Sequence, residues 1–285
     1  MTTADQELEG RLALVTGASR GIGLAIARRF AAAGAHVAVS ARSLDTSATF
    51  PGTLAETVRL IEDAGGTAFP VRADVTQAAD RARLIEEVQA QLGPIDVLVN
   101  NAGTASYSPA ADVSPEDYEY TVAQYFRAPF ELSQRVIPGM RESGGGWILN
   151  IGSSTARHPE GPPYNESART LGLVLYASLK AALHRFTAGL AAELHEDGIA
   201  VNSVAPVAAV RTPSVEAAGV LSPDRPEIIE PAEFMAEAAL ALCAGDPRTL
   251  TGRVVYSSPI LTELGRTVRT LDGREEYPVQ PVARG

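Results

Sequence analysis

The stretch Thr16-Gly-Ala-Ser-Arg-Gly-Ile-Gly23 is the most informative for the fold, because it joins a short apolar run to a long amphipathic one. We expect residues 11–16 to form a strand and residues 22–33 to form a helix that ends at Gly34. Glycine permits the tight turn between them, and its missing side chain lets phosphate oxygens approach the helix N-terminus. The stretch therefore predicts a nucleotide-binding turn, against the alternative of a glycine turn without a ligand.

The same alternation of short apolar and longer amphipathic runs continues along the chain. It predicts further strands at residues 35–40, 68–72, 95–100, 147–151, 200–204 and 253–257, and helices at 54–64, 78–91, 115–141, 173–196 and 231–243. Alternating strands and helices indicate an α/β fold with a doubly wound parallel sheet. We expect one domain over residues 1–285, with residues 259–285 as a C-terminal extension and residues 155–172 as a lid or surface excursion.

Composition excludes several classes of partner. The 285 residues carry 24 Lys and Arg against 34 Asp and Glu, a net charge of −10. This balance argues against nucleic acid and anionic membranes as partners. Cys243 is the single cysteine, so the chain has no internal disulfide and no cysteine metal cluster. We expect a cytoplasmic protein, because no run approaches the roughly 18 apolar residues of a membrane span and neither end resembles a targeting signal.

A second stretch, Tyr176-Ala-Ser-Leu-Lys180, lies on the predicted helix at 173–196 and pairs a phenol with an ammonium one turn away. A nearby cation favours the phenolate, so we expect Lys180 to lower the pKa of Tyr176 from its usual value of about 10. The phenol would then donate and accept protons near neutral pH. With a nucleotide-binding turn, this indicates hydride transfer to or from a carbonyl.

These two motifs, with Asp74-Val75, Asn100-Asn-Ala-Gly103 and Ser153, resemble the short-chain dehydrogenase/reductase family over residues 10–258. Residues 150–153 and 205–212 are most similar to its hydroxysteroid-dehydrogenase-like branch. The resemblance implies a Rossmann-type sheet of seven parallel strands and a nicotinamide cofactor.

The resemblance also implies which residues bind that cofactor. Asp74 would bond the adenine, although an aspartate at a strand end is more often a helix cap, and Asn101 has a mainly structural alternative. The implied set is Gly17, Ser19, Arg20, Gly21, Ile22, Gly23, Arg42, Asp74, Val75, Asn101, Ala102, Gly103, Tyr176, Lys180 and Thr212.

The end of the second predicted strand decides between NAD and NADP. A carboxylate there would bind the ribose of NAD and repel a 2′-phosphate. Aligned with the family, Ala41 takes that position, with Arg42 after it and Arg20 in the glycine turn. Two guanidinium groups bind a 2′-phosphate well, so we expect NADP(H) to be favoured over NAD(H).

By the same resemblance, the catalytic residues are Tyr176, Lys180 and Ser153. Tyr176 transfers the proton, Lys180 also bonds the nicotinamide ribose, and Ser153 orients the substrate oxygen. Ser153 and Tyr176 are 23 residues apart, about ten more than is usual in the family. Tyr164 lies nearer the usual distance but has no lysine four residues later, so we reject it as the acid.

The sequence departs from the family at Tyr125, where an asparagine usually holds a water that links the lysine to solvent. The Tyr125 hydroxyl could replace that water, which is the alternative we favour, or the ring could fill the site. Gln124 lies beside it. A further departure is Pro206-Val207, where Pro-Gly is usual, and it weakens the assignment of Thr212. None of the four His has metal-ligand spacing, and His184 is interpreted as structural.

The function expected is an NADP-preferring oxidoreductase that interconverts a ketone or aldehyde and an alcohol. An NAD-dependent alcohol dehydrogenase and a low-turnover nucleotide-binding sensor stay open as alternatives. Residues 104–114, 155–172 and 207–228 are expected to set substrate specificity. Family members pair their long helices, so we expect helices 115–141 and 173–196 to form a homodimer or homotetramer.

Overall fold

The computed structural model describes residues 6–45, 51–104, 107–212, 215–216 and 229–278. Both ends of the chain, on which the targeting prediction rests, and parts of the predicted loops 42–53, 104–114 and 207–228 lie outside these ranges. Seven parallel strands form the main sheet in the order β3-β2-β1-β4-β5-β6-β9. The strands are β1 Leu12–Thr16, β2 His36–Ala41, β3 Thr67–Arg72, β4 Val97–Asn100, β5 Gly146–Ile151, β6 Ile199–Ala205 and β9 Val254–Tyr256.

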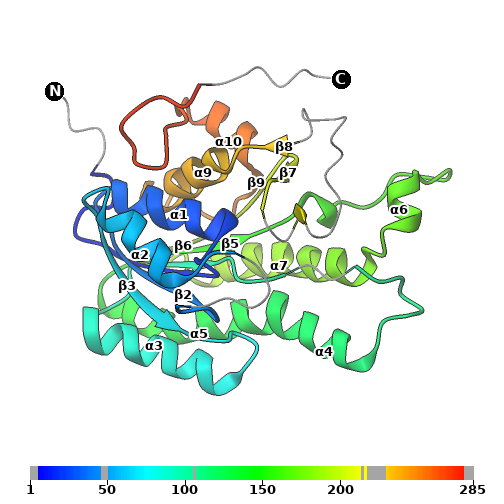
Figure 1. The fold of residues 1–285 in the computed structure, drawn as a ribbon, viewed down its shortest axis with the longest axis horizontal. Helices are drawn as coiled ribbons and strands as arrows, with labels where there is room; N and C mark the ends of the chain where they lie inside the picture. The colour runs from blue at the N-terminus through cyan, green and yellow to red at the C-terminus, as the bar shows by residue number, and fades with distance from the viewer. Residues whose placement is uncertain (1–5, 46–50, 105–106, 213–214, 217–228, 279–285) are drawn as a thin grey trace.

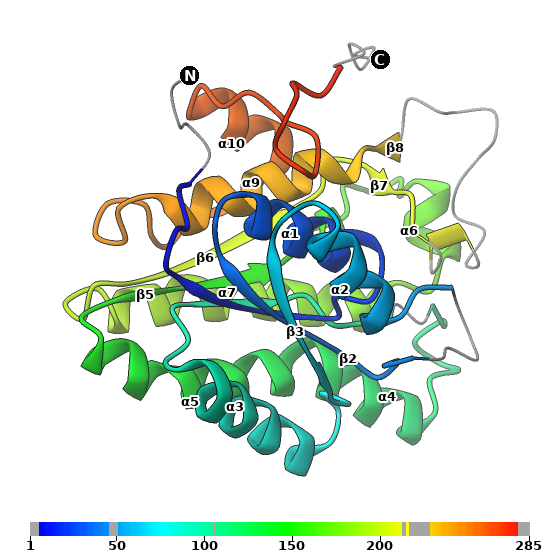
Figure 2. The ribbon, with the colours of Figure 1, turned by 60° about the vertical axis from the view of Figure 1, so that its left-hand side comes forward.

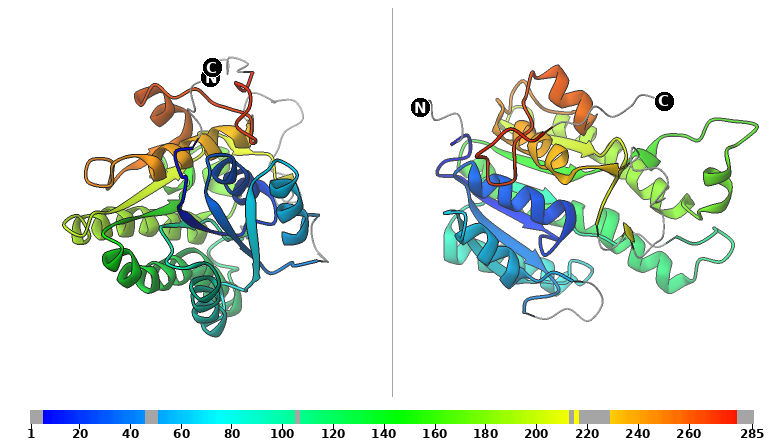
Figure 3. Two further views of the ribbon diagram at one scale, coloured as in Figure 1. Left: turned by 90° about the vertical axis from the view of Figure 1, so that its left-hand side faces the viewer. Right: turned by 45° about the horizontal axis from the view of Figure 1, so that its top comes forward.

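Helices cover both faces of this sheet, which confirms the predicted doubly wound fold (Figures 1 and 3). One layer is α1 Gly21–Ala32, α2 Leu54–Glu62, α9 Ala232–Ala244 and α10 Ser257–Glu263. The other is α3 Ala78–Leu92, α4 Pro115–Val122, α5 Ala128–Glu142 and α7 Val174–Glu193. Short elements outside both layers are 3-10 helix η2 Ser154–Ala156, α6 Glu166–Thr170, β7 Ala209–Val210 and β8 Ile229–Glu230.

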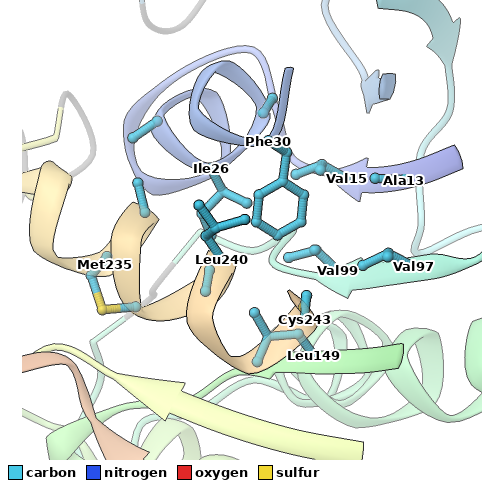
Figure 4. Close-up of a cluster of buried hydrophobic side chains, with 14 of the residues drawn as sticks. Ala13, Val15, Ile26, Phe30, Val97, Val99, Leu149, Met235, Leu240 and Cys243 are labelled. Atoms are coloured by element: carbon cyan, nitrogen blue, oxygen red, sulfur yellow. The ribbon is translucent and has the colours of Figure 1, made fainter. Parts of the chain in front are cut away.

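Side-chain alternation along the strands builds one core on each face of the sheet. In β1, Ala13 and Val15 belong to the core beneath α1 and α9, whereas Leu12 and Leu14 belong to the core beneath α3 and α5. Figure 4 shows the first core, where Phe30 of α1 lies against the strands. Because both faces are covered, the strands are continuously apolar, as parallel strands usually are.

The strand order reverses between β1 and β4, and their carboxyl ends lie next to each other. In open α/β sheets, ligands bind in the crevice outside such a reversal point. The glycine-rich turn follows β1, and the Asn100–Gly103 segment follows β4. The fold therefore brings these two motifs together at one edge.

The predicted helix at 115–141 is not one continuous α-helix. Residues Ala123–Arg127 form a π-helical turn, η1, between α4 and α5. Pro138 lies inside α5 without ending it. Single π-turns within α-helices are frequent at functional sites, and this one carries Gln124 and Tyr125 at its buried face.

The C-terminal segment is more ordered than its weak periodicity predicted. Residues 257–263 form α10, and Leu261 and Val268 are buried against the core. Figure 2 shows α10 beside α9. Seven residues are too few for a helical pattern to be recognised, which is why the sequence missed this helix. Leu261 and Val268 thus pack on the same core as α1 and α9.

Residues 155–172 leave the body of the fold, as the predicted excursion requires. Figure 1 shows α6 projecting beyond the end of α7, and most residues of the segment are exposed. The excursion is tied at two places. Arg157 donates through Nε to the Tyr256 hydroxyl at 2.7 Å, and the amide of Ser108 donates to the carbonyl of Gly172 at 3.1 Å.

Candidate active site

The glycine-rich turn packs against two segments that are distant in sequence. Gly17 has a φ of +67°, and a Cβ there would come within 2.7 Å of the Cα of Ala102. Gly21 has a φ of +56°, and a Cβ there would come within 2.8 Å of Cγ2 of Thr212. Residues other than glycine are therefore excluded at both positions, because the backbone conformation disfavours them and a Cβ has no room.

A cavity of about 490 Å³ opens over this turn at the carboxyl ends of the strands. Of the predicted cofactor residues, all except Gly23 line it: Gly17, Ser19, Arg20, Gly21, Ile22, Arg42, Asp74, Val75, Asn101, Ala102, Gly103, Tyr176, Lys180 and Thr212. Gly23 instead packs on the carbonyl of Gly17. Of the predicted catalytic residues, Ser153 alone is not among the lining residues, although it contacts Tyr176.

The start of α1 suits an anion. Its N-cap residue, Arg20, makes no side-chain cap, and the first turn contains no acidic residue. The first amide N–H groups of a helix have no partner within the helix, and the helix dipole favours negative charge there. A phosphate can therefore be held at this end of the cavity.

Asn101 holds the turn in place as well as lining the cavity. Its Nδ2 donates to the carbonyls of Thr16 at 2.8 Å and Gly17 at 3.2 Å. Asp74 also lines the cavity and makes local bonds, since its Oδ1 accepts from the amide and the hydroxyl of Thr76. Asn101 thus has the structural role considered from sequence, whereas Asp74 bonds to Thr76 and is not the cap of α3, whose N-cap residue is Gln77.

Arg20 at the start of α1 and Arg42 just after β2 lie close enough for their charges to interact. Arg20 donates through Nη2 to the carbonyl of Gly52 at 2.8 Å, and Arg42 donates through Nη1 to the Tyr120 hydroxyl at 2.9 Å. Burial lowers the pKa of Arg20, and the charge of Arg42 lowers it further. The two cations therefore repel each other, and an anion between them would relieve the repulsion.

Tyr176 lies among hydroxyl and aromatic groups. Its hydroxyl hydrogen-bonds with Ser153, whose Oγ also lies 2.8 Å from Oγ1 of Thr155. Its ring makes edge contacts with Tyr107 and Tyr125, at centroid distances of 6.3 and 5.0 Å. Burial raises the pKa of Tyr176 to about 12, and the Ser153 hydrogen bond opposes the rise.

The predicted lowering of the Tyr176 pKa by Lys180 is therefore wrong for the protein without a ligand. Lys180 is itself buried and donates through Nζ to the carbonyl of Ile151 at 2.6 Å. Burial lowers the pKa of Lys180 to about 7. Desolvation is the largest cause of both pKa shifts. An ammonium that carries about half its charge near neutral pH cannot stabilise a phenolate strongly.

Tyr125 presents its ring, not its hydroxyl, to Lys180. The Nζ of Lys180 lies 4.7 Å from the Tyr125 ring centroid, a cation–π distance. The same ring packs on Gly103, where a Cβ would come within 2.5 Å of Cε1. This contact favours the alternative in which the ring occupies the family's water site, and the part of the hydroxyl in the mechanism stays a prediction. Gln124 accepts from the amide of Thr104 at 2.9 Å and so supports the loop.

Tyr164 is correctly rejected as the acid, because it is exposed on the excursion and does not line the cavity. Sequence reasoning missed Tyr107, Tyr120 and Thr155. Tyr107 lies in a loop that was expected to affect specificity, but no local pattern distinguishes it. Tyr120 reaches Arg42 across 78 residues of sequence, a contact that no motif spacing reveals.

The cavity has the features of a dinucleotide site. The glycine turn and the uncapped start of α1 form a cradle that a Cβ would fill, and the guanidinium pair lies beside it. Tyr176 and Lys180 border the same cavity. The arrangement can therefore bind a redox dinucleotide and move a proton at its reactive end.

Comparisons with known proteins agree with this geometry. A family model for short chain dehydrogenases matches residues 11–219. The chain belongs to the short-chain dehydrogenase/reductase family. The 7alpha-hydroxysteroid dehydrogenase of Escherichia coli (strain K12) is 33% identical over 258 residues, which cover 88% of this chain and 94% of that protein.

Solved structures of other dehydrogenases and reductases share the fold. A 3-oxoacyl (acyl-carrier-protein) reductase from Agrobacterium tumefaciens C58, with NADP bound, has a TM-score of 0.76 and 28% identity over 90% of this chain and 96% of its own. The L-sorbose reductase of Gluconobacter frateurii, with NADPH and L-sorbose, has a TM-score of 0.74 and 30% identity over 88% and 96% of the two chains. This short-chain dehydrogenase/reductase is therefore an oxidoreductase of a family that uses NAD(P)(H).

Two kinds of feature are absent from the described ranges. They contain no helix that is both long enough and apolar enough to span a bilayer. Across the same ranges, no three His, Cys, Asp or Glu side chains gather as a metal site would require.

Proposed function

We propose that this enzyme uses NADP(H) in preference to NAD(H) and interconverts a ketone or aldehyde with an alcohol, with Tyr176 as general acid and base. One observation carries the proposal. A single cavity is lined both by Arg20 and Arg42 and by Tyr176 and Lys180. The NADP bound to the A. tumefaciens relative and the NADPH bound to the G. frateurii relative support the same cofactor class.

The chain's own residues divide the work. When bound, NADPH supplies the hydride. Gly17 and Gly21 let the phosphates approach, and Arg20 and Arg42 hold the 2′-phosphate. Ser153 orients the carbonyl oxygen, and Tyr176 donates its proton to that oxygen as the alcohol forms. The pKa of about 12 keeps Tyr176 protonated at neutral pH, which suits reduction better than alcohol oxidation.

The substrate we propose is a ketone on an apolar ring or chain. Tyr107 and Tyr125 lie on either side of Tyr176, so the reacting carbonyl meets aromatic walls. The 7alpha-hydroxysteroid dehydrogenase of E. coli supports cyclic ketones as the first class to test. We further propose a cytoplasmic enzyme, since the charge balance is acidic and the lone Cys243 is buried.

Cofactor binding tests the preference for NADP(H). Arg42→Ala should weaken NADPH by about 1.5–3 kcal/mol, the scale of hydrogen bonds to charged groups, and leave NADH nearly unchanged. Titration calorimetry with both cofactors measures this directly. Arg248→Ala is the matched control, because it removes an exposed guanidinium that does not line the cavity. Equal losses for NADPH and NADH would reject the assignment of Arg42.

A further inference from the structure

Tyr176, Lys180 and His184 follow one another at four-residue spacing along α7 and so lie on one face of that helix. Tyr176 and Lys180 border the cavity. His184 is only half-buried, yet its Nε2 is fully buried. The imidazole therefore extends from the protein interior toward solvent, one turn beyond the buried ammonium.

The buried side of His184 faces a small polar space at the end of β5. A Cβ on Gly152 would clash with Nε2 of His184 and would lie within 2.9 Å of Oγ of Ser203. Ser203 is fully buried in β6. Within the described residues, neither Nε2 of His184 nor Oγ of Ser203 has a hydrogen-bond partner. Such groups are rare in folded proteins and require an explanation.

The same end of β5 holds Lys180. Its Nζ donates to the carbonyl of Ile151, the residue before Gly152, so Lys180 and His184 contact two consecutive residues. On its other side, Lys180 meets the ring face of Tyr125, which offers no proton acceptor. The charge of Lys180 also acts on His184, whose pKa is lowered first by burial and then by this charge.

We propose that His184, together with Ser203, carries protons between solvent and Lys180 during turnover. The inference rests on the proposed carbonyl reduction. In each cycle, the Tyr176 O–H bond breaks as the O–H bond of the alcohol forms, which leaves a phenolate. Lys180 returns one proton to the phenolate. His184 then gives its Nε2 proton to the neutral amine and takes one from solvent at Nδ1, and rotation of the ring resets it. One solvent proton is consumed per alcohol formed.

The proton affinity of Lys180 also suits the relay. The pKa of about 7 for Lys180 lets the amine gain and lose a proton near neutral pH. His184 therefore has a role beyond the structural one inferred from sequence. It is a positioning and relay residue, because it is not itself among the residues that line the cavity.

The test compares His184→Gln with wild type in stopped-flow and steady-state reduction of a 7-ketosteroid or cyclohexanone by NADPH. Tyr176 begins with its proton, so the first turnover should keep the wild-type rate. Later turnovers should slow by about tenfold, with KM and the NADPH Kd unchanged.

Free imidazole should restore part of the loss, and Ser203→Ala should give a smaller effect. His195→Gln, an exposed histidine just after α7, is the matched control and should behave as wild type.

The outcomes separate the two proposals. If wild type does not reduce any carbonyl with NADPH, the proposed function fails. If wild type turns over and His184→Gln has the same steady-state rate, the relay is wrong. A slower first turnover, or a loss that imidazole does not restore, would show that the substitution disturbs the site and would also overturn the relay.

Discussion

Tyr125 is the residue at which the structure changes the account most. Because its ring face meets Lys180, we expect Tyr125→Phe to keep turnover within about twofold of wild type from pH 6 to 9. Tyr125→Leu removes the ring and with it about 0.5–2 kcal/mol of cation–π stabilisation of the ammonium, so it should slow turnover and lower the pKa of Lys180. Steady-state rates across pH measure both. A 10–100-fold loss in Tyr125→Phe would restore the hydroxyl to the mechanism.

The burial of Lys180 predicts how the free energy of unfolding, measured without cofactor, changes with pH. Its pKa falls from 10.5 to about 7 on folding, so the unfolded chain binds more protons between these values. The free energy of unfolding should therefore rise with pH over this range relative to Lys180→Met, by about 2–4 kcal/mol in total. Urea denaturation of both proteins between pH 6.5 and 9.5 measures the difference. A constant difference across pH would mean that Lys180 is not desolvated.

The positions of individual site residues could be predicted from the sequence where these residues belong to a recognisable motif. Gly17, Arg42, Tyr176 and Lys180, for example, all line one cavity. The pKa of Tyr176 was not predictable, because it depends on the burial of both partners and not on their spacing. Tyr107 and Tyr120 were missed for a related reason, since their contacts are between loops and helices distant in sequence.

At the scale of elements, the C-terminal segment is held by a buried ionic cluster. Glu237 of α9 accepts from Arg29 of α1 at 2.8 Å and from Arg266, just after α10, at 2.7 Å. Arg266 also donates to Glu7 at 2.6 Å. Removing the carboxylate of Glu237 takes one ion-pair partner from both Arg29 and Arg266, and breaking a buried ion pair is strongly destabilising.

We therefore expect Glu237→Gln to lower the free energy of unfolding by about 3–5 kcal/mol. The exposed pair of Arg59 and Asp63 provides the control, and Asp63→Asn should cost less than about 0.5 kcal/mol. Chemical denaturation of the three proteins gives the comparison. Similar losses in both variants would mean that burial adds nothing to the cluster.

Hydrophobic periodicity predicted every strand of the main sheet, because short apolar runs between glycines and prolines are distinctive. It did not predict η1 or α10. The π-turn arises from packing of Tyr125 against Gly103 and Lys180, and α10 is too short for a repeat to appear. Tertiary contacts, which no local window contains, decide both elements.

For the whole molecule, we propose self-association through α5 and α7. Phe126 of η1, Phe130 of α5 and Phe186 of α7 form an aromatic cluster, and Phe130 is 44% exposed. Light scattering at micromolar concentration should give two or four times the mass of one chain. Phe130→Glu should shift the protein toward monomer, whereas Tyr118→Glu, an exposed aromatic on α4, should not. A monomeric wild type would contradict the proposal.

The central claim is that one cavity couples NADPH to carbonyl reduction through the Tyr176 proton. The most direct measurement is the NADPH-dependent reduction rate of wild type and Tyr176→Phe, with the NADPH Kd of each protein measured first. We predict that Tyr176→Phe binds NADPH as wild type does, because it loses only the hydroxyl, and that its kcat falls by about 10²–10⁴-fold. Unchanged turnover in Tyr176→Phe, with loss in Tyr164→Phe instead, would contradict the account.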